Sequence, residues 1–335
     1  MRTKLLGYLS AILLLSITSC DESTDTSEYG NWVKQSDFEG VTRSGAISFS
    51  IGDYAYVGLG SDGDDYLTDF WRFDPSKNFW QKMASFPGVG RLSTVSFSLD
   101  GKGYLGTGYN DDLDEEELND FWEYDPDTDT WTQKADFPGS KRYAAVGFAL
   151  EGNGYIGTGY DGNYLKDFWR YDPTSDSWTQ AVSLYGSKRE SATAFVINGQ
   201  AYIATGRNNG VYLYDFWRFD PSDESWTDLT LYDEDDTYET YLSAISRYNG
   251  VSFSVDGLGY LATGISDSYT SSVYSYDPDA NEWEDDITAF EGSSRSNAVA
   301  FVVSNKAYIA TGRNSSQRFD DIWSFDPLAE YDEYD

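Results

Sequence analysis

The chain has 335 residues, and its 57 acidic residues against 23 basic ones give a formal net charge of −34. Such a charge repels nucleic acid and anionic membrane surfaces, so we exclude both as direct partners. The chain contains no histidine, which removes the commonest general base and the commonest transition-metal ligand. A single cysteine, Cys20, excludes an intramolecular disulfide and a cysteine-based zinc site.

The first nineteen residues predict a lipoprotein signal peptide. Arg2 and Lys4 precede an apolar run from Leu5 to Ile17, which is too short to span a bilayer as a mature helix. A cysteine directly after the small residues 18 and 19 resembles the lipobox of bacterial lipoproteins, although Ile17 replaces the usual leucine. The resemblance implies lipidation of Cys20 and anchoring to the outer membrane of a bacterial cell envelope through that lipid only. An ordinary secretion signal is the alternative.

Residues 20–30 form an acidic stretch without periodicity, and we expect a flexible tether there. The folded domain should then span residues 31–335. Whether it faces the periplasm or the cell surface stays open.

A motif of aromatic residues followed by Asp-Pro, and usually by a later tryptophan, occurs six times in this domain. Its clearest copy is residues 167–178, Asp-Phe-Trp-Arg-Tyr-Asp-Pro-Thr-Ser-Asp-Ser-Trp. Successive Asp-Pro pairs lie 51, 47, 48, 57 and 49 residues apart. A period near 50 residues indicates a repeat architecture.

All eleven tryptophans belong to this motif. Five stand beside the Asp-Phe position, five follow the Asp-Pro turn, and the eleventh is Trp32. The sixth copy ends at Pro327 without a later tryptophan. We therefore predict that the segment around Trp32 supplies the last strand of the sixth repeat, and that the repeated indoles are packing anchors.

Residues 142–180 illustrate the four short strands of one repeat. A small apolar strand over 142–150 is followed by a turn at Glu151-Gly152, a glycine-rich strand over 155–160, a third strand over 167–171 and a fourth from Ser177. Four short antiparallel strands per repeat are typical of a β-propeller blade. The turn between the first two strands recurs at Asp100-Gly101, Glu151-Gly152, Asn198-Gly199 and Asp256-Gly257.

Three features of each repeat resemble the Kelch family: the second-strand glycines, the aromatic-Asp pair of the third strand, and a tryptophan six residues after that Asp. The resemblance covers residues 32–327. It departs from the family in one respect, because the double glycine is Thr-Gly in five repeats and Leu-Gly in one. It implies an all-β, six-bladed Kelch-type β-propeller whose last blade is closed by an N-terminal strand. We expect a monomer.

Each repeat also carries one arginine at the start of its innermost strand, namely Arg43, Arg91, Arg142, Arg189, Arg247 and Arg295. Two interpretations stay open. Six-fold geometry would place these arginines at the mouth of the central channel, where guanidinium groups bind carboxylates, sulfates or phosphates. Alternatively, each arginine is structural and pairs with a blade carboxylate such as the Asp before Phe-Trp. Arginines at this position of Kelch repeats serve both purposes.

The loops expected on the same face provide further candidate ligand contacts. Tyr164 and Tyr212 lie in polar loops, where tyrosine on a rigid scaffold suits ligand binding, including stacking on sugars. The acidic loops at 61–66 and 110–117 have oxygen ligands for Ca²⁺, but neither matches a twelve-residue calcium loop. We predict no metal and no cofactor.

Two function classes remain from the sequence. The first is a non-catalytic, envelope-anchored binding module that holds a glycan, peptide or protein on the arginine-bearing face. The second is a sugar mutarotase of the N-acetylneuraminate type, which resembles this chain in blade number and in which Glu190 beside Arg189 would act as the acid-base group. Copper oxidases of the galactose oxidase type are excluded, because their metal needs histidine. A glycosidase pair cannot be selected among 57 acidic residues.

Overall fold

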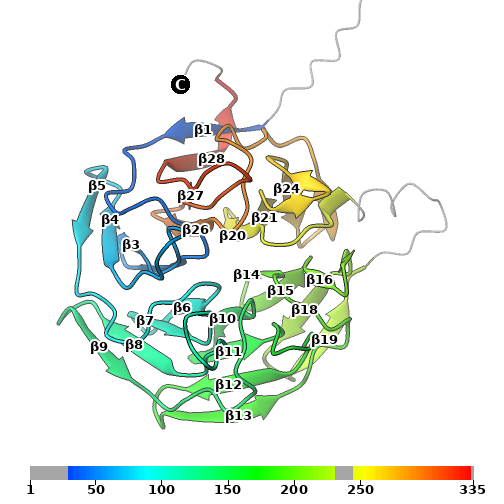
Figure 1. Ribbon diagram of the computed structural model, residues 1–335. Coiled ribbons are helices and arrows are strands. Elements are labelled where there is room, and N and C mark those ends of the chain that lie inside the picture. The colour runs from blue at the N-terminus through cyan, green and yellow to red at the C-terminus, as the bar shows by residue number, and fades with distance from the viewer. Residues whose placement is uncertain (1–28, 231–243, 333–335) are drawn as a thin grey trace, which may run out of the picture.

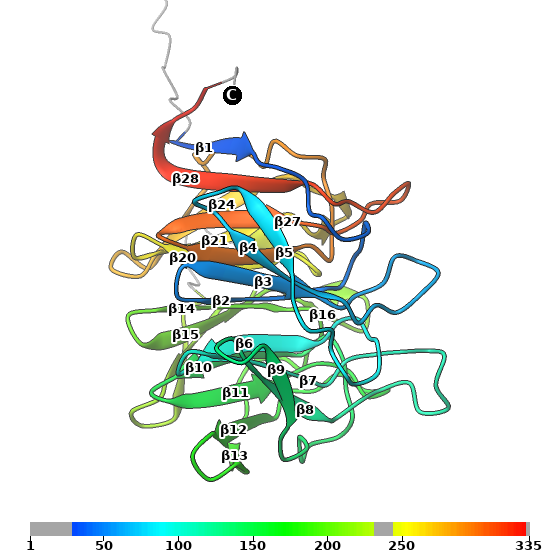
Figure 2. The ribbon, with the colours of Figure 1, turned by 90° about the vertical axis from the view of Figure 1, so that its left-hand side faces the viewer.

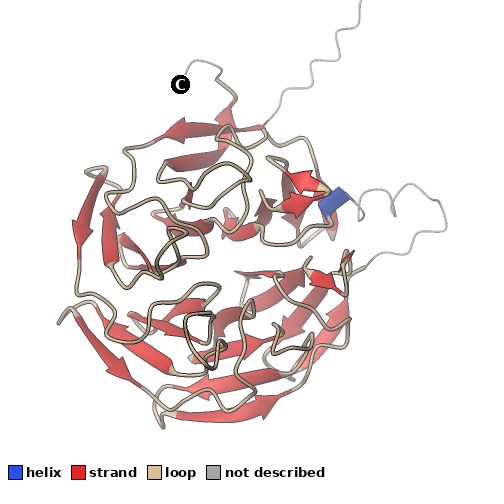
Figure 3. Ribbon diagram, viewed as in Figure 1, coloured by secondary structure: helices blue, strands red, loops and turns tan. Residues whose placement is uncertain are grey.

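Six four-stranded antiparallel sheets surround a central axis like the blades of a wheel (Figure 1). This computed structural model describes residues 29–230 and 244–332. Nearly all regular structure in these residues is strand, and the helical residues among them are 244–245 (Figure 3). The prediction of an all-β, six-bladed propeller is therefore confirmed.

In blades 1 to 5 the four strands follow in chain order from the axis outward, whereas the outermost strand of blade 6 comes from the N-terminus. Blade 1 contains β2 (Ile47–Ile51), β3 (Tyr54–Gly58), β4 (Phe70–Asp74) and β5 (Phe79–Lys82), and blade 2 contains β6 (Val95–Leu99), β7 (Lys102–Gly106), β8 (Phe121–Asp125) and β9 (Thr130–Gln133). Blade 3 contains β10 (Val146–Leu150), β11 (Asn153–Gly157), β12 (Phe168–Asp172) and β13 (Ser177–Ala181).

The remaining blades include two additions to this plan. Blade 4 contains β14 (Thr193–Ile197), β15 (Gln200–Ala204), β18 (Trp217–Asp220) and β19 (Ser225–Asp228), and blade 5 contains β20 (Val251–Val255), β21 (Leu258–Ala262), β24 (Val273–Asp277) and β25 (Glu282–Glu284). Their second-to-third-strand loops fold into small hairpins, β16 (Arg207–Asn208) with β17 (Val211–Tyr212), and β22 (Ile265–Ser266) with β23 (Ser268–Tyr269). Blade 6 contains β26 (Val299–Val303), β27 (Lys306–Ala310), β28 (Ile322–Glu330) and β1 (Tyr29–Lys34).

The first strands are shorter than the sequence predicts. In blade 3 the pairing of β10 with β11 begins at Val146, not at residue 142. Ala144 has a φ of 52° and Thr158 has a φ of 60°, so the backbone leaves the strand conformation before β10 and after β11. At the other end of this hairpin, Glu151 and Gly152 both have positive φ, as the predicted tight turn requires.

The departure from the double glycine of the Kelch family also has a local explanation. The first position, Thr158, has a positive φ but enough space for a side chain, whereas a Cβ added to Gly159 would lie 2.7 Å from the carbonyl oxygen of Tyr143. The second glycine is therefore a steric requirement. At the first position, glycine is favoured only because the backbone has a positive φ. Holding a threonine in that conformation costs on the order of 1–3 kcal/mol.

The hydrophobic core lies between neighbouring blades. In blade 3 the ring of Phe148 stacks on Tyr155 at 5.3 Å, and Tyr155 contacts Phe219 of blade 4 at 5.4 Å. The tryptophans after the Asp-Pro turns join the blades as well. The indole N–H of Trp226 donates to the carbonyl oxygen of Val182 at 3.1 Å, and its ring packs 5.1 Å from Phe168 of blade 3. Each blade is therefore attached to the one before it.

The N-terminal strand closes the wheel, as predicted. β1 pairs antiparallel with β28 and places Trp32 opposite Phe325 (Figures 1 and 2). The Trp32 side chain is fully buried and packs against Phe325 at 4.5 Å and Phe290 at 5.0 Å. The strand begins at Tyr29, two residues before the predicted start of the domain.

Several predictions fall on residues outside the described ranges. The signal peptide at 1–19, the lipidated Cys20 and the tether up to residue 28 lie there and stay predictions. Within residues 29–230 and 244–332, no helix has the length and apolar character needed to cross a membrane.

Candidate functional site

The six arginines point into their blades, where their guanidinium groups are fully enclosed. Arg142 donates from Nη1 and Nη2 to the two carboxylate oxygens of Asp167, at 2.7 and 2.8 Å. Nη1 also donates to the carbonyl oxygen of the left-handed Thr158 at 3.0 Å, and Nε donates to that of Ser140 at 3.0 Å. Trp169 donates its indole N–H to Asp167 at 2.9 Å. The arginine thus joins the end of the second strand to the start of the third.

The same arrangement recurs around the wheel. All six arginine side chains are 0–1% exposed. Besides Arg142–Asp167, the pairs are Arg43–Asp69, Arg91–Asp120, Arg189–Asp215 and Arg295–Asp321. Burial alone would raise the pKa of Asp167, but the hydrogen bond and charge of Arg142 outweigh it and hold this pKa below its ordinary value.

Blade 5 departs from this plan at two positions together. Ser272 stands where the other blades have the carboxylate, and Tyr274 stands where they have tryptophan. Arg247 donates instead to the hydroxyl and carbonyl oxygens of Ser272, at 3.0 and 3.1 Å. Without a carboxylate, burial lowers the pKa of Arg247 to about 10.

The expected electropositive rim therefore does not form from these arginines. The mouth of the channel is not lined by their guanidinium groups, because carboxylate and carbonyl oxygens within the blade engage them. The observed hydrogen bonds are those expected if each arginine is structural and pairs within its own blade. Ligand contact by any of the six arginines stays a prediction. A ligand would first have to displace these partners from a buried cation, which is costly.

The chain also forms a closed ring of hydrogen bonds that the sequence did not reveal. The residue two places after each arginine donates its backbone N–H to the carbonyl oxygen of the equivalent residue in the neighbouring blade, at 2.9–3.1 Å. The ring runs through Gly45, Asn297, Asn249, Ser191, Ala144 and Ser93, and back to Gly45. All six have φ between 52° and 65°. The only sequence signal is a small residue or asparagine at each position.

The channel inside this ring offers no charged group to a ligand. Three cavities of about 130, 220 and 270 Å³ follow it, and no charged residue lines any of them in the described chain. Two serines of the channel wall bond to the adjoining blade: Ser96 donates to the carbonyl oxygen of Ser48, and Ser252 to that of Ala194, both at 2.9 Å. Chemistry suited to a ligand therefore lies above the ring, on the loop face.

An arc of half-buried tyrosines, which we call the tyrosine arc, follows one side of this face. It runs across blades 2 to 5 through Tyr109, Tyr143, Tyr160, Tyr164, Tyr212 and Tyr248. Ring centroids are 4.9 Å apart for Tyr109 and Tyr143, 5.7 Å for Tyr143 and Tyr160, and 5.1 Å for Tyr160 and Tyr164. Tyr212 and Tyr248 are 5.3 Å apart. Tyr143 and Tyr248 directly precede the ring residues in sequence, so the arc borders the channel mouth.

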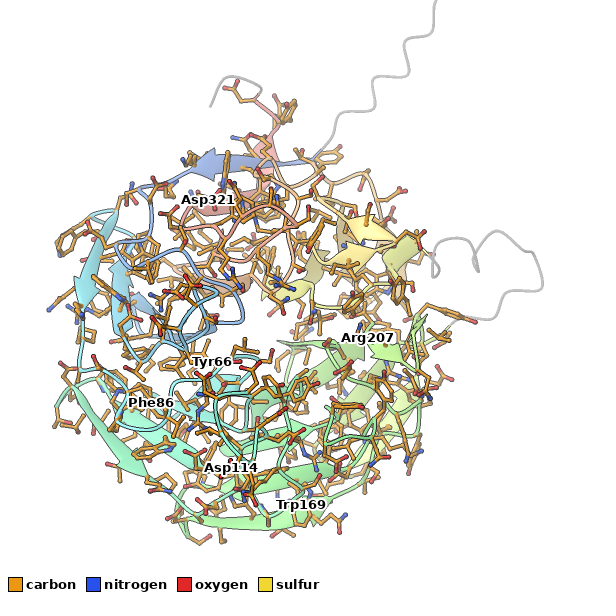
Figure 4. All side chains as sticks on the ribbon, viewed as in Figure 1. Tyr66, Phe86, Asp114, Trp169, Arg207 and Asp321 are labelled. Atoms are coloured by element: carbon orange, nitrogen blue, oxygen red, sulfur yellow. The ribbon has the colours of Figure 1, made fainter. Side chains whose placement is uncertain are left out.

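An ion pair lies between the two parts of the arc. Glu190, only 3% exposed, accepts a hydrogen bond from Nε of Arg207 at 2.8 Å. The guanidinium of Arg207 lies 4.5 Å from the ring centroid of Tyr248. Figure 4 shows Arg207 on the opposite side of the central opening from Tyr66. Burial, and then the charge of Glu190, raises the pKa of Tyr143 to about 12, so this hydroxyl is protonated at neutral pH.

The opposite side of the mouth is chemically different. Ser44 pairs with Ser61 and Ser296 with Arg313 at the positions where the arc has tyrosines and the ion pair. The acidic loops lie farther along, where Tyr66 donates to Asp111 at 2.6 Å. The candidate site is therefore one-sided, within a wheel whose backbone is nearly symmetric.

Two of the predicted ligand contacts belong to the arc, and its four other members, Tyr109, Tyr143, Tyr160 and Tyr248, were missed. Tyr164 and Tyr212 lie where the sequence placed them, on the loop face, and Glu190 pairs with Arg207 and not with Arg189. Tyr143 and Tyr160 lie within the strands that the sequence predicts over 142–150 and 155–160, and Tyr248 and Tyr109 have the equivalent positions in blades 5 and 2. The signal that could have found them is their position, directly after the repeat arginine or after the Thr-Gly pair.

No cluster of three or more carboxylate or cysteine groups within the described ranges is arranged to hold a metal ion. The acidic loops are instead occupied by their own hydrogen bonds, such as that of Tyr109 to Glu116 at 2.7 Å.

Comparisons with known proteins agree with the blade architecture. A family model for the Kelch motif matches residues 108–138, 154–184 and 188–230. Among solved structures, one titled "Structure of YjhT" superposes with a TM-score of 0.70 at 16% sequence identity, and the alignment covers 86% of this chain and 95% of that one. At this identity the likeness shows the fold alone. A search of curated protein sequences finds no match. With three matched repeats and six blades built on one plan, the chain is a six-bladed Kelch-repeat β-propeller.

Proposed function

We propose that the chain is a glycan-binding module whose ligand rests on the tyrosine arc. The observation that carries this proposal is the arc itself, where six half-buried tyrosines border the channel mouth around the Glu190–Arg207 pair. Exposed aromatic faces stack on the C–H faces of sugar rings, and the ion pair supplies donors and acceptors for hydroxyl groups. The rigid ring below the arc holds it in one geometry, which lowers the entropy lost on binding.

The test is calorimetric titration with a panel of purified glycans. The variant Tyr143→Ala/Tyr160→Ala removes two adjacent faces of the arc, and we expect at least a tenfold loss of affinity for any glycan that binds. Tyr331→Ala is the matched control, because Tyr331 is a 46% exposed tyrosine far along the chain on the last blade. Unchanged affinity in the arc variant, with the fold intact by circular dichroism, would exclude the arc as the site.

A sugar mutarotase is the second candidate, and one observation favours it. Glu190 and Arg207 place a buried carboxylate and a guanidinium side by side at the channel mouth. An acid-base group and a cation for the sugar carboxylate are what anomer exchange of an acidic sugar needs. The two functions separate in an NMR exchange experiment on N-acetylneuraminate. Faster anomer exchange that Glu190→Gln abolishes would favour the enzyme, and exchange at the uncatalysed rate would favour the binding module.

A further inference from the structure

A second groove lies on the outer flank of blade 4, beside the hairpin of β16 and β17. Its volume is about 540 Å³, within the range of ligand pockets. Three segments form it: the connection that leads to Arg189, the loop after β17, and the outer strands β18 and β19. The groove is separate from the channel, and none of the cavities below the ring shares its lining residues.

Two exposed tyrosines flank this groove, and one of them is peculiar to blade 4. Tyr185 is 61% exposed and Tyr214 is 45% exposed. Tyr185 stands where the connections to blades 2 and 3 have Pro87 and Pro138. A ligand that covers the apolar surface of such rings removes it from water, which favours binding. The blade therefore presents aromatic faces that its own packing does not use.

The arginine–aspartate pair of blade 4 is also incomplete. Arg189 reaches Asp215 through Nη2 and Oδ2 only, whereas Arg142 in blade 3 engages both carboxylate oxygens of Asp167. Oδ2 of Asp215 also accepts the indole N–H of Trp217 at 2.7 Å. Oδ1 is buried and has no hydrogen-bond partner among residues 29–230 and 244–332.

The incomplete pair has a local cause. In blade 3 the guanidinium of Arg142 rests 4.9 Å from the ring of Phe137, which holds it in place. Blade 4 has Leu184 at that position, so Arg189 has no aromatic support there. A buried carboxylate oxygen without a donor is unfavourable, and a ligand hydroxyl that donates to Oδ1 would remove that penalty.

The charge of the groove decides which ligand class fits. Asp215 and the exposed Asp228 contribute carboxylates, and the lining residues, all within the described part of the chain, include no lysine or arginine. Anionic ligands are therefore repelled. Carboxylate acceptors beside tyrosine faces suit a ligand that has many hydroxyl donors and flat C–H surfaces, which is the chemistry of a neutral saccharide.

The groove is continuous with the tyrosine arc through one residue. Tyr212 lines the groove, and its ring lies 5.3 Å from Tyr248 of the arc. We infer that the groove is a second subsite for the same glycan, so that the ligand is a neutral oligosaccharide long enough to cross the β16–β17 hairpin. This inference rests on the proposed glycan-binding function and adds the class and minimum size of the ligand.

Calorimetric titration with a chain-length series tests the inference. The probes are glucose, xylose and mannose with the corresponding cellohexaose, maltohexaose, xylohexaose and mannohexaose. We expect at least one hexaose to bind tenfold or more tightly than its monosaccharide. Tyr185→Ala/Tyr214→Ala should remove this advantage and leave the weak monosaccharide affinity unchanged, whereas Tyr143→Ala/Tyr160→Ala should weaken both.

The outcomes separate the two proposals. If the groove variant binds the hexaose like the wild type while the arc variant does not, the second subsite is wrong and the arc stands. If no sugar binds, both are wrong. Choline is included as a cationic probe, because carboxylates and tyrosines also bind quaternary ammonium groups. Choline binding lost in the groove variant, without any chain-length effect, would overturn the saccharide assignment. Tyr331→Ala again controls for loss of an exposed tyrosine.

Discussion

At the scale of single residues, each position of the repeated Asp-Phe-Trp motif has its own structural role. Asp167 holds Arg142 and also accepts the indole N–H of Trp169, while Phe168 between them is buried in the core. Blade 5 changes the Asp and Trp positions together, to Ser272 and Tyr274. The joint change is understandable, because an indole N–H without its carboxylate would lose its acceptor.

Removing one carboxylate tests this arrangement. Asp167→Asn preserves the shape of the side chain but leaves the enclosed Arg142 without a counter-charge. We expect the free energy of unfolding to fall by about 3 kcal/mol, the lower end of the range for a broken buried pair. Urea denaturation followed by circular dichroism measures it.

The control is Asp53→Asn, which removes the same charge from an exposed turn and should change stability by less than about 0.5 kcal/mol. A loss below about 1 kcal/mol for Asp167→Asn would contradict the structural role assigned to the pair.

At the scale of elements, the sequence predicted the strands and their order well, but it did not predict where the innermost strands begin. The Asp-Pro turns, the Glu151-Gly152 hairpin and the closing strand at Trp32 follow from residue type and spacing. The ring residue Ala144 could not be predicted, because its positive φ is imposed by bonds to neighbouring blades and not by its own preference. The direction in which the arginine side chains point could not be predicted either. The channel-rim and the structural interpretations place Arg142 at the same position in the sequence.

The seam between β1 and β28 supports a prediction at this scale. Trp32 lies in the segment that joins the two ends of the chain, and it is fully buried against Phe325 and Phe290. Trp32→Ala should lower the free energy of unfolding by about 3–5 kcal/mol. It should also increase protease cleavage near the seam, because the other blades keep their fourth strand through a short hairpin.

Trp178→Ala provides the comparison inside a continuous blade. Trp178 is only partly buried and has the equivalent position in β13. We expect a smaller loss of stability and no new cleavage near residues 29–34. Equal losses and equal cleavage patterns in the two variants would show that the seam is no weaker than the other blades.

At the scale of the whole molecule, the wheel is held by repeated links between blades, and its site breaks the symmetry. The backbone ring passes through all six blades and the inter-blade tryptophan hydrogen bond is present for Trp32, Trp131, Trp178 and Trp226, whereas Glu190, Arg207 and the tyrosine arc occupy one side. Repetition made the fold predictable from sequence, because six copies support one interpretation. It made the site hard to predict, because a binding surface consists of what differs between copies.

The buried arginine–aspartate pairs make the stability of the fold depend on pH in a defined direction. Four of the carboxylates, Asp69, Asp120, Asp167 and Asp321, have pKa values below the ordinary value, since the arginine hydrogen bond and charge outweigh burial. A carboxyl group with a lowered pKa in the folded state stabilises the protein above its unfolded pKa, which is about 3.9. That contribution is lost as the pH falls through the folded pKa.

We therefore expect the melting temperature to fall steeply below about pH 4, after little change or a slight rise between pH 7 and 5, where relief of the −34 net charge acts in the opposite direction. Differential scanning calorimetry at constant ionic strength from pH 7 to 3 measures this curve. Asp167→Asn supplies the control, because it lacks one of the four titrating pairs. Its deficit relative to the wild type should shrink as the pH drops below 4, since the wild-type carboxylate then becomes neutral too. A deficit that stays constant down to pH 3 would mean that the charge of Asp167 is not what stabilises the blade.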